Sequence, residues 1–174
     1  ASSLIKKKIK KGDVVSIMAP NTTAMYEAHF GIPMTGAILN TINIRLDAKT
    51  ISYIIGHSKT KIIFVDTEFL PIIRTALKIT IIAIKDDNKF SKNIIKEQLY
   101  EDFLKKGSKL STSNFKIKDE WSPISLGYTS GTTNKPKGVV THHRGAYLNA
   151  ISNQLTWNMK KNPTYLWTLP MFHC

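Results

Sequence analysis

Short runs of apolar residues alternate with more polar, amphipathic segments over the first half of the chain. The apolar runs are rich in β-branched residues and are bounded by polar or glycine-containing turns, which predicts buried strands. These predicted strands are Val14–Met18, Ile38–Ile44, Lys61–Val65 and Thr80–Ile84. Strands that are apolar on both faces are covered on both sides, so the pattern indicates an α/β fold with a doubly wound, largely parallel sheet.

The segments between these strands have the signals of helices. Asn21 or Thr22 can cap the first helix, and Asp47 can cap the second, in which isoleucines share one face and Gly56 marks the end. The predicted helices are Thr22–Met34, ending near Pro33; the segment from Asp47 to Gly56; and Phe69–Leu77. Each helix follows a strand, as a doubly wound sheet requires.

The composition changes at about Lys85. Lys, Asp, Asn and Ser dominate residues 85–120, and only Ile94–Leu104 has helical periodicity. We therefore divide the chain into a first α/β part (1–84), a polar surface connection (85–120) and a final part (121–174). The final part is predicted to contain the strands Ile124–Tyr128 and Gly138–Thr141, the helix Arg144–Trp157 and the strand Tyr165–Leu169.

The segment Tyr128–Val139 holds hydroxyls, glycines and two lysines within a dozen residues. Glycine lets backbone N–H groups approach an anion, hydroxyls donate to its oxygens, and lysine adds a flexible positive charge. These three properties together point to a polyphosphate. A polar hairpin without a ligand is the alternative for such a loop when it is considered alone.

The loop is not a Walker loop. A Walker loop needs Gly-x4-Gly-Lys followed by Ser or Thr, whereas Pro136 stands at the second glycine position and Gly138 follows Lys137. Proline fixes φ and removes an N–H donor. The β-branched residues after Gly138 predict a strand, so the loop is expected to connect two strands with no helix N-terminus beneath the phosphates.

The run Thr129–Thr133 followed by Pro136–Gly138 resembles the phosphate-loop signature of the adenylate-forming acyl-activating enzymes. Further segments resemble the plant-type acyl-CoA synthetases of that superfamily, so the similarity covers nearly the whole chain. These segments are Gly12–Val15 with Ala19–Asn21, Tyr26–Gly31, Leu39–Leu46 and Pro170–Cys174. Two positions depart from the family pattern: Asn134 stands where a glycine or another small residue is usual, and Thr141 replaces a common histidine.

The resemblance implies an ATP-dependent acid–thiol ligase that converts a carboxylic acid to an acyl-adenylate and passes the acyl group to coenzyme A. It implies that Thr129, Ser130, Gly131, Thr132, Thr133 and Lys137 bind the phosphates of ATP. It also places His173 beside the carboxylate, so that Lys137 and His173 are the candidate catalytic residues. ATP, Mg²⁺ and coenzyme A are the expected cofactors, and no metal site built from side chains is expected.

Family members are about three times as long as this chain. We therefore expect a partial N-terminal AMP-binding domain without the C-terminal domain, and we expect this chain alone to be inactive. A non-catalytic protein that binds ATP or another anion through the same loop is an open alternative.

The formal net charge of +13 raises a second alternative, a nucleic-acid-binding protein. The lysines are scattered, aromatic residues do not interleave with them, and only Arg45, Arg74 and Arg144 are arginines. Stacking platforms and bidentate arginines are the usual means of nucleic-acid recognition, so this alternative is the weaker one.

The chain has one cysteine, Cys174, so it forms no disulfide within itself and fits a reducing, intracellular compartment. Which compartment is not distinguished, and neither is the oligomeric state. No apolar run reaches the ~18 residues that suggest a membrane span. His142, His143 and Arg144 begin a predicted helix, where capping of that helix is at least as good an explanation as contact with a substrate.

Overall fold

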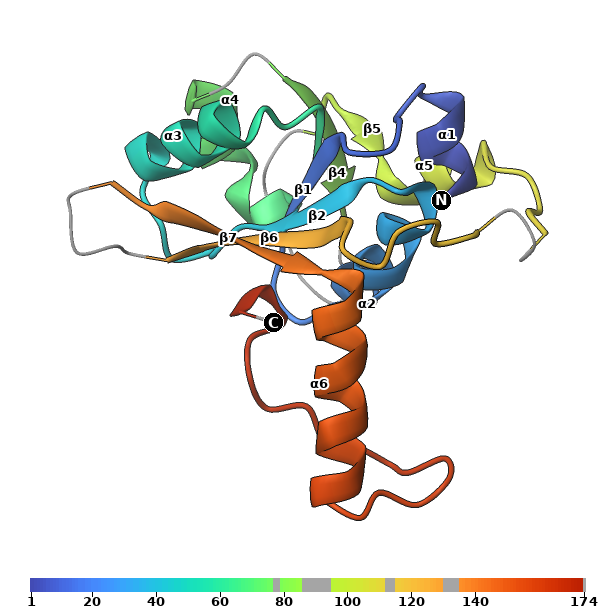
Figure 1. Cartoon of the computed structure of the whole chain (residues 1–174). Coiled ribbons are helices and arrows are strands. Elements are labelled where there is room, and N and C mark those ends of the chain that lie inside the picture. The colour runs from blue at the N-terminus through green and yellow to red at the C-terminus, as the bar shows by residue number, and fades with distance from the viewer. Residues whose placement is uncertain (77–78, 86–94, 112–114, 130–134, 174) are drawn as a thin grey trace.

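The computed structural model describes residues 1–76, 79–85, 95–111, 115–129 and 135–173. Within these ranges seven strands form one sheet in the order β5-β4-β3-β1-β2-β6-β7 (Figure 1). All neighbouring strands are parallel except β6 and β7, which are antiparallel. The strands are β1 (Val14–Met18), β2 (Ile38–Thr41), β3 (Ile62–Asp66), β4 (Thr80–Ile84), β5 (Gln98–Leu99), β6 (Pro123–Thr129) and β7 (Lys137–His142).

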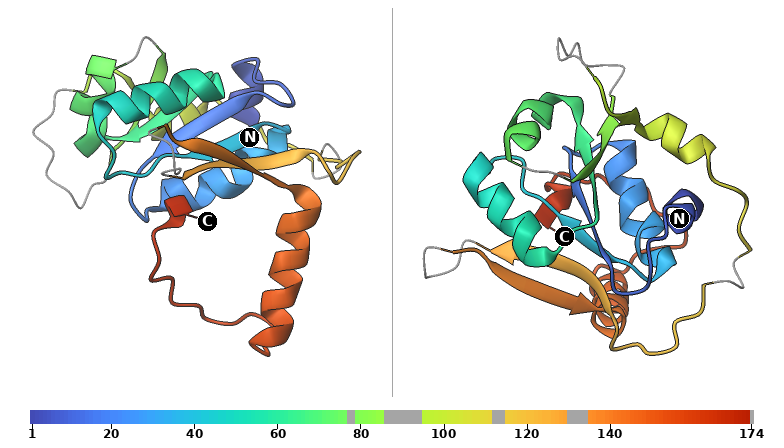
Figure 2. Two further views of the ribbon diagram at one scale, coloured as in Figure 1. Left: turned by 60° about the vertical axis from the view of Figure 1, so that its left-hand side comes forward. Right: turned by 90° about the horizontal axis from the view of Figure 1, so that it is seen from above.

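Helices cover both faces of the parallel part of the sheet (Figure 2). The α-helices are α1 (Ser2–Lys6), α2 (Thr23–Gly31), α3 (Ala48–Ser58), α4 (Leu70–Ala76), α5 (Tyr100–Lys105) and α6 (His143–Thr156). Short 3₁₀ turns are η1 (Pro33–Thr35), η2 (Thr67–Phe69) and η4 (Met171–His173). The predicted doubly wound, largely parallel α/β fold is confirmed.

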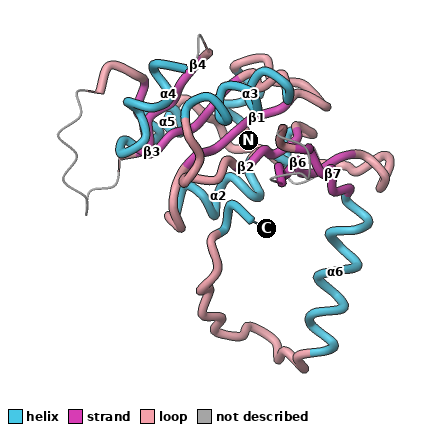
Figure 3. Tube along the Cα trace, turned by 90° about the vertical axis from the view of Figure 1, so that its left-hand side faces the viewer, coloured by secondary structure: helices cyan, strands magenta, loops and turns pink. Residues whose placement is uncertain are grey.

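Two hydrophobic clusters lie on opposite faces of the sheet, because successive side chains of a strand point to opposite sides. In β3, Ile62 and Phe64 pack in the cluster with α1, α2 and α5, whereas Ile63 and Val65 pack in the cluster with α3 and α4. Figure 3 shows α2 on one side of the strands and α3 and α4 on the other. This double coverage explains why the strands are continuous apolar runs.

The last part of the chain stands apart from this layered body. Helix α6 projects away from the sheet and buries none of its side chains. The segment after it returns without regular structure to η4, which packs its Phe172 into the α2 side of the core.

The structure corrects four sequence-based expectations. Helix α3 continues through Gly56 and ends at Ser58, and its C-cap residue Lys59 adopts the left-handed conformation. The extended segment predicted up to Ile44 forms a ladder only as far as Thr41. Tyr165–Leu169 is not a strand, because this segment pairs with no strand of the described chain, and Leu166 and Leu169 are exposed.

The fourth correction concerns the start of the helix predicted over Ile94–Leu104. Its described residues before Tyr100 are not helical; Gln98 and Leu99 instead form β5 beside β4, and the helix begins at Tyr100. Tyr100 and Phe103 are buried in the core and pack edge-on against Phe64. Part of the segment expected to be a polar connection therefore completes the sheet and covers it.

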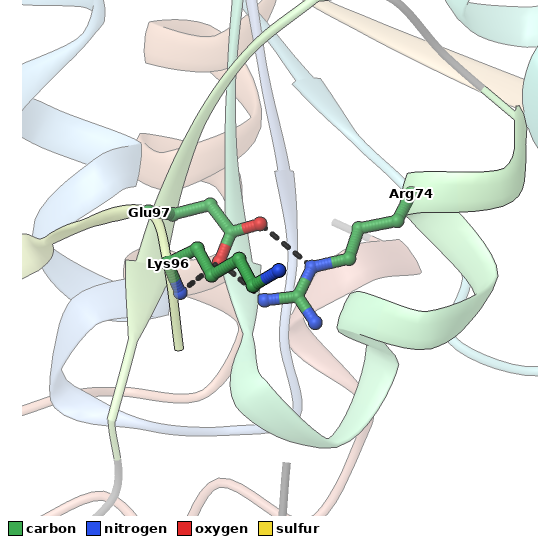
Figure 4. Close-up of polar contacts among 3 residues, drawn as sticks. All are labelled: Arg74, Lys96 and Glu97. Atoms are coloured by element: carbon green, nitrogen blue, oxygen red, sulfur yellow. Dashed lines mark hydrogen bonds and ion pairs between the residues drawn. The ribbon is translucent and has the colours of Figure 1, made fainter. Parts of the chain in front are cut away.

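Arg74 of α4 forms an ion pair with Glu97, the residue directly before β5. Its Nε and Nη2 atoms donate to the two carboxylate oxygens of Glu97 over 2.7 and 2.6 Å (Figure 4). The backbone N–H of Lys96 also donates to this carboxylate, over 3.0 Å. The paired guanidinium lowers the pKa of Glu97 to about 2.

Candidate functional site

Strands β6 and β7 form the hairpin that carries the candidate phosphate loop. In the ladder Thr129 lies opposite Lys137, so these two residues form the last pair before the loop. Both are exposed. Ser130, Gly131, Thr132 and Thr133 lie outside the described residues, so the structure places the two ends of the loop.

One residue before the loop, Tyr128 is held by helix α3. Its hydroxyl lies 2.7 Å from Nδ1 of His57, and the two rings meet edge-on with centroids 5.8 Å apart. His57 in turn stacks on Tyr53, one helical turn earlier, at 5.4 Å. Burial, with a smaller contribution from Tyr53, raises the pKa of Tyr128, which keeps its hydroxyl protonated at neutral pH.

Lys135, which follows the loop and precedes β7, contacts Tyr53 of the same aromatic group. Nζ of Lys135 lies 6.0 Å from the centroid of the Tyr53 ring, at the outer limit of a cation–π contact. Residues on both sides of the loop therefore contact α3. The lysine rests against an aromatic face rather than a carboxylate, so its charge is not neutralised by that contact.

His173, the candidate on the acyl side, is exposed in the turn η4. Two polar residues hold this turn. Asn21, which follows β1, donates from Nδ2 to the Leu169 carbonyl over 2.8 Å and accepts from the Met171 N–H at 2.8 Å. The Thr41 hydroxyl, at the end of β2, donates to the Phe172 carbonyl over 2.9 Å.

The start of the phosphate loop and the η4 turn that carries His173 therefore lie at one edge of the sheet. Strands β1, β2 and β6 are parallel, so Asn21, Thr41 and Thr129 all stand at carboxyl ends of strands. Helix α2, after β1, covers one face, whereas α3, after β2, covers the other. In open α/β sheets, ligands usually bind at the carboxyl edge, where the chain paths diverge in this way.

Sequence reasoning missed the residues that position the site. The contacts of Asn21 with Leu169 and of Thr41 with Phe172 join residues 148 and 131 positions apart, and no local pattern encodes them. The His57–Tyr128 contact is likewise a product of packing. The position of Asn21, directly after a predicted strand, was the one available signal.

The other polar candidates near the hairpin have structural roles. His142 caps α6, its Nδ1 accepting from the Gly145 N–H at 2.9 Å. Arg144 donates to Glu120 over 2.6 Å. The expected capping role is thus confirmed for His142, while Cys174 lies outside the described residues.

No group of three or more His, Cys, Asp and Glu side chains in the described ranges is arranged to hold a metal ion. No helix in that part of the chain has the length and apolar character needed to cross a bilayer.

A largely parallel sheet covered by helices on both faces defines an open-sheet α/β protein. The model of the AMP-binding enzyme family matches residues 1–174. The chain belongs to this family.

Plant CoA ligases are among its relatives. The chain is 51% identical to the peroxisomal butyrate–CoA ligase AAE11 of Arabidopsis thaliana, in an alignment of 187 positions that covers 100% of this chain and 33% of that protein. It is 49% identical to the peroxisomal benzoate–CoA ligase of the same plant, covering 100% of this chain and 32% of the relative. The chain thus spans about one third of the length of these relatives.

Solved CoA ligases share the fold. The N-terminal domain of FACL13 from Mycobacterium tuberculosis superposes with a TM-score of 0.71 at 26% identity, covering 98% of this chain and 41% of that chain. The o-succinylbenzoate CoA synthetase of Bacillus subtilis, in complex with ATP and magnesium, gives a TM-score of 0.73 at 21% identity over 98% of this chain and 32% of that chain.

Proposed function

We propose that this chain is the nucleotide-binding part of an AMP-forming acid–CoA ligase. The supporting observation is the hairpin loop between Thr129 and Lys137 at the carboxyl edge of the sheet, in a chain of the AMP-binding family. The ligase would activate a carboxylic acid with ATP and then transfer the acyl group to coenzyme A.

In the first step a carboxylate oxygen attacks the α-phosphorus of ATP. The new bond forms the acyl-adenylate, and the bond to the β-phosphate bridge oxygen breaks, releasing pyrophosphate. Such transfers depend on positioning and on stabilising the charge of the leaving group. Thr129, Ser130, Thr132 and Thr133 would donate hydroxyl hydrogen bonds, Gly131 would let the backbone approach, and Lys137 would offset the pyrophosphate charge.

In the second step the sulfur of coenzyme A attacks the acyl carbonyl, its proton is lost, and AMP leaves. His173 would donate a hydrogen bond to an oxygen of the carboxylate or of the adenylate. The hydrogen bonds of Asn21 and Thr41 to the η4 segment would fix the position of His173. Mg²⁺ would enter bound to phosphate oxygens of the nucleotide, which are ligands that it prefers.

The relatives suggest the class of acid and the compartment. Their names include butyrate–CoA, acetate/butyrate–CoA and benzoate–CoA ligases, each described as peroxisomal. We propose a short- to medium-chain aliphatic or an aromatic acid as the substrate of the whole protein, and the peroxisome as its location. Colocalisation of the tagged whole protein with a peroxisomal marker tests the location.

ATP–pyrophosphate exchange in the whole protein tests the proposed reaction. Exchange that depends on butyrate or benzoate is expected, and Lys137→Ala should lower it at least a hundredfold, as the loss of a charged transition-state contact does. Lys161→Ala is the matched control, because Lys161 is exposed in the segment after α6. Exchange that is unchanged by Lys137→Ala, or that is absent with every acid, would overturn the proposal.

A further inference from the structure

A cavity opens at the edge of the sheet opposite to the candidate active site. It has a volume of about 440 Å³ and is bordered by Lys11 before β1, Gly36 before β2, Pro123 at the start of β6 and His143 after β7. Since β1, β2 and β6 are parallel and β7 is antiparallel, all four residues stand at the amino edge. The phosphate loop follows the carboxyl end of β6, so the cavity is a separate site.

The walls of this amino-edge cavity are mainly apolar. Phe30 and Met34 line it from the end of α2 and from η1, and Phe115, Ile117 and Ile124 line it from the segment that leads into β6. Phe30, Met34 and Ile117 are exposed by 53, 47 and 62%, although they are large apolar side chains. A cavity of a few hundred Å³ with such walls is of the size that small ligands occupy.

Positive charge gathers around the apolar walls. Lys11, Lys116 and Lys118 border the cavity, against a single carboxylate, that of Asp119. Asp119 is already engaged, since its oxygens accept from the Trp121 N–H at 3.0 Å and from the Ser122 hydroxyl at 3.4 Å. Those neutral donors leave its negative charge in place, so the three lysines and one aspartate at the cavity sum to a net charge of +2, which attracts an anion.

An imidazole in the wall has an unused polar atom. Nδ1 of His29 pairs with the Met25 carbonyl at 2.9 Å, whereas its Nε2 is buried without a hydrogen-bond partner among the described residues. Because Nε2 is shielded from solvent, it lies behind the cavity surface and is not a contact for a ligand there. Across the cavity, burial and the charge of Lys11 lower the pKa of His143.

Gly36 lies close to the turn that contains Lys11, beside the amino-edge cavity. Gly36 has φ of +78°, and a Cβ on it would lie 3.2 Å from Cβ of Lys11. The Gly12 N–H donates to the Gly36 carbonyl over 2.9 Å, which joins the turn before β1 to the turn before β2. The Lys11 backbone is thus fixed beside the cavity by a contact that only glycine permits.

We propose that this amino-edge cavity binds an amphiphilic anion, an apolar chain or ring that carries one carboxylate. The apolar part packs against Phe30, Met34 and Ile117. The carboxylate lies near Lys11, with Lys116 and Lys118 also bordering the cavity. This site is distinct from the acyl site beside His173, and the proposal does not depend on the reaction proposed above.

Binding of decanoate to the 174-residue chain tests the proposal, with decan-1-ol and decyltrimethylammonium as ligands of the same chain length but different charge. We expect saturable binding of decanoate below its micelle-forming concentration, at least tenfold tighter than either control ligand, as a charge-assisted contact gives. Amide NMR shifts should change at Gly36, Ile117 and Ile124. Shifts confined to α6, equal affinity for the three ligands, or no saturable binding would each overturn the proposal.

Two variants locate the site. Met34→Trp fills the cavity and should abolish the binding, whereas Leu155→Trp, on exposed α6, should leave it unchanged. Lys11→Ala should weaken decanoate about tenfold without affecting decan-1-ol, with Lys161→Ala as its control. Circular dichroism shows whether Met34→Trp folds. If it does not fold, Lys11→Ala still tests the proposal, because Lys11 is exposed. Unchanged decanoate affinity in Lys11→Ala would contradict the proposed position of the carboxylate.

Discussion

The hydroxyl of Tyr128 lies 2.7 Å from Nδ1 of His57, and this contact joins the hairpin that carries the phosphate loop to helix α3. Strand β6 is long and lies near the edge of the sheet, with only the antiparallel β7 beyond it. β7 exposes most of its residues, so the hairpin has little core of its own. The polar contact with α3 therefore contributes to the position of the loop.

Tyr128→Phe removes the hydroxyl and keeps the ring. We expect the 174-residue chain to lose about 1 kcal/mol of unfolding free energy, the value of one hydrogen bond, in urea titrations. In the whole protein, KM for ATP should rise about threefold, which corresponds to part of that energy. Tyr147→Phe, on an exposed tyrosine of α6, is the control and should change neither quantity.

The effect of Tyr128→Phe should not depend on pH between 7 and 9. Burial raises the pKa of Tyr128, so its hydroxyl stays protonated throughout this range. A stability difference that disappears as the pH rises from 7 to 9 would contradict the assigned contact.

Asn21→Ala tests whether the η4 segment is held as the structure indicates. The substitution removes two hydrogen bonds, those to the Leu169 carbonyl and from the Met171 N–H, and should cost about 1–3 kcal/mol of stability. In the whole protein, kcat/KM for the acid should fall about tenfold, with KM for ATP unchanged, because the displaced residue is His173. An equal loss for both substrates would point to general unfolding. Asn149→Ala, on exposed α6, provides the baseline.

The Arg74–Glu97 pair predicts a dependence of stability on pH. The folded-state pKa of Glu97 is lowered from 4.5 to about 2, so its contribution is complete above about pH 4.5 and is lost as the pH falls toward 2. Glu97→Gln should cost about 1 kcal/mol at pH 6, as a well-aligned pair near the surface does. The difference between the variant and the parent chain should shrink steadily below pH 4.5.

Urea titrations at pH 6, 4 and 2.5 measure this dependence. Asp102→Asn is the control, because Asp102 pairs with Lys105 at 3.3 Å in an exposed position. Equal effects of the two substitutions at pH 6 would show that the bidentate geometry of Arg74 adds nothing.

The exposed face of α6 predicts self-association of the 174-residue chain. Leu148 and Leu155 are 50 and 75% exposed and lie two helical turns apart on one side of the helix. Large exposed apolar surfaces promote association. We expect the sedimentation coefficient to rise with protein concentration, and Leu148→Glu with Leu155→Glu to shift the chain to monomer, since glutamate is compatible with a helix.

Asn149→Glu with Ser152→Glu adds the same charge beside that apolar face and is the control. A chain that is monomeric at all concentrations without any substitution would disprove the predicted association. Monomerisation by the control pair would instead assign the effect to net charge.

The sequence alone determined the class of fold, because the physical signals for it are local. Apolar, β-branched runs such as Val14–Met18 and Thr80–Ile84 predict strands covered on both faces, and Asp47 caps α3 as predicted. The family also followed from contiguous residues, since the run from Thr129 to Lys137 resembles the family signature within a few positions.

Tertiary structure decided which local tendencies were realised. Tyr165–Leu169 has the composition of a strand but pairs with no strand in the described ranges, and a ladder needs a partner. Gly56 could have ended α3, yet the helix continues to Ser58, whose hydroxyl and neighbours pack against the sheet. The contacts of Asn21, Thr41 and His57 with residues more than seventy positions away arise only when the strands are set side by side, because folding brings together groups that no sequence window contains.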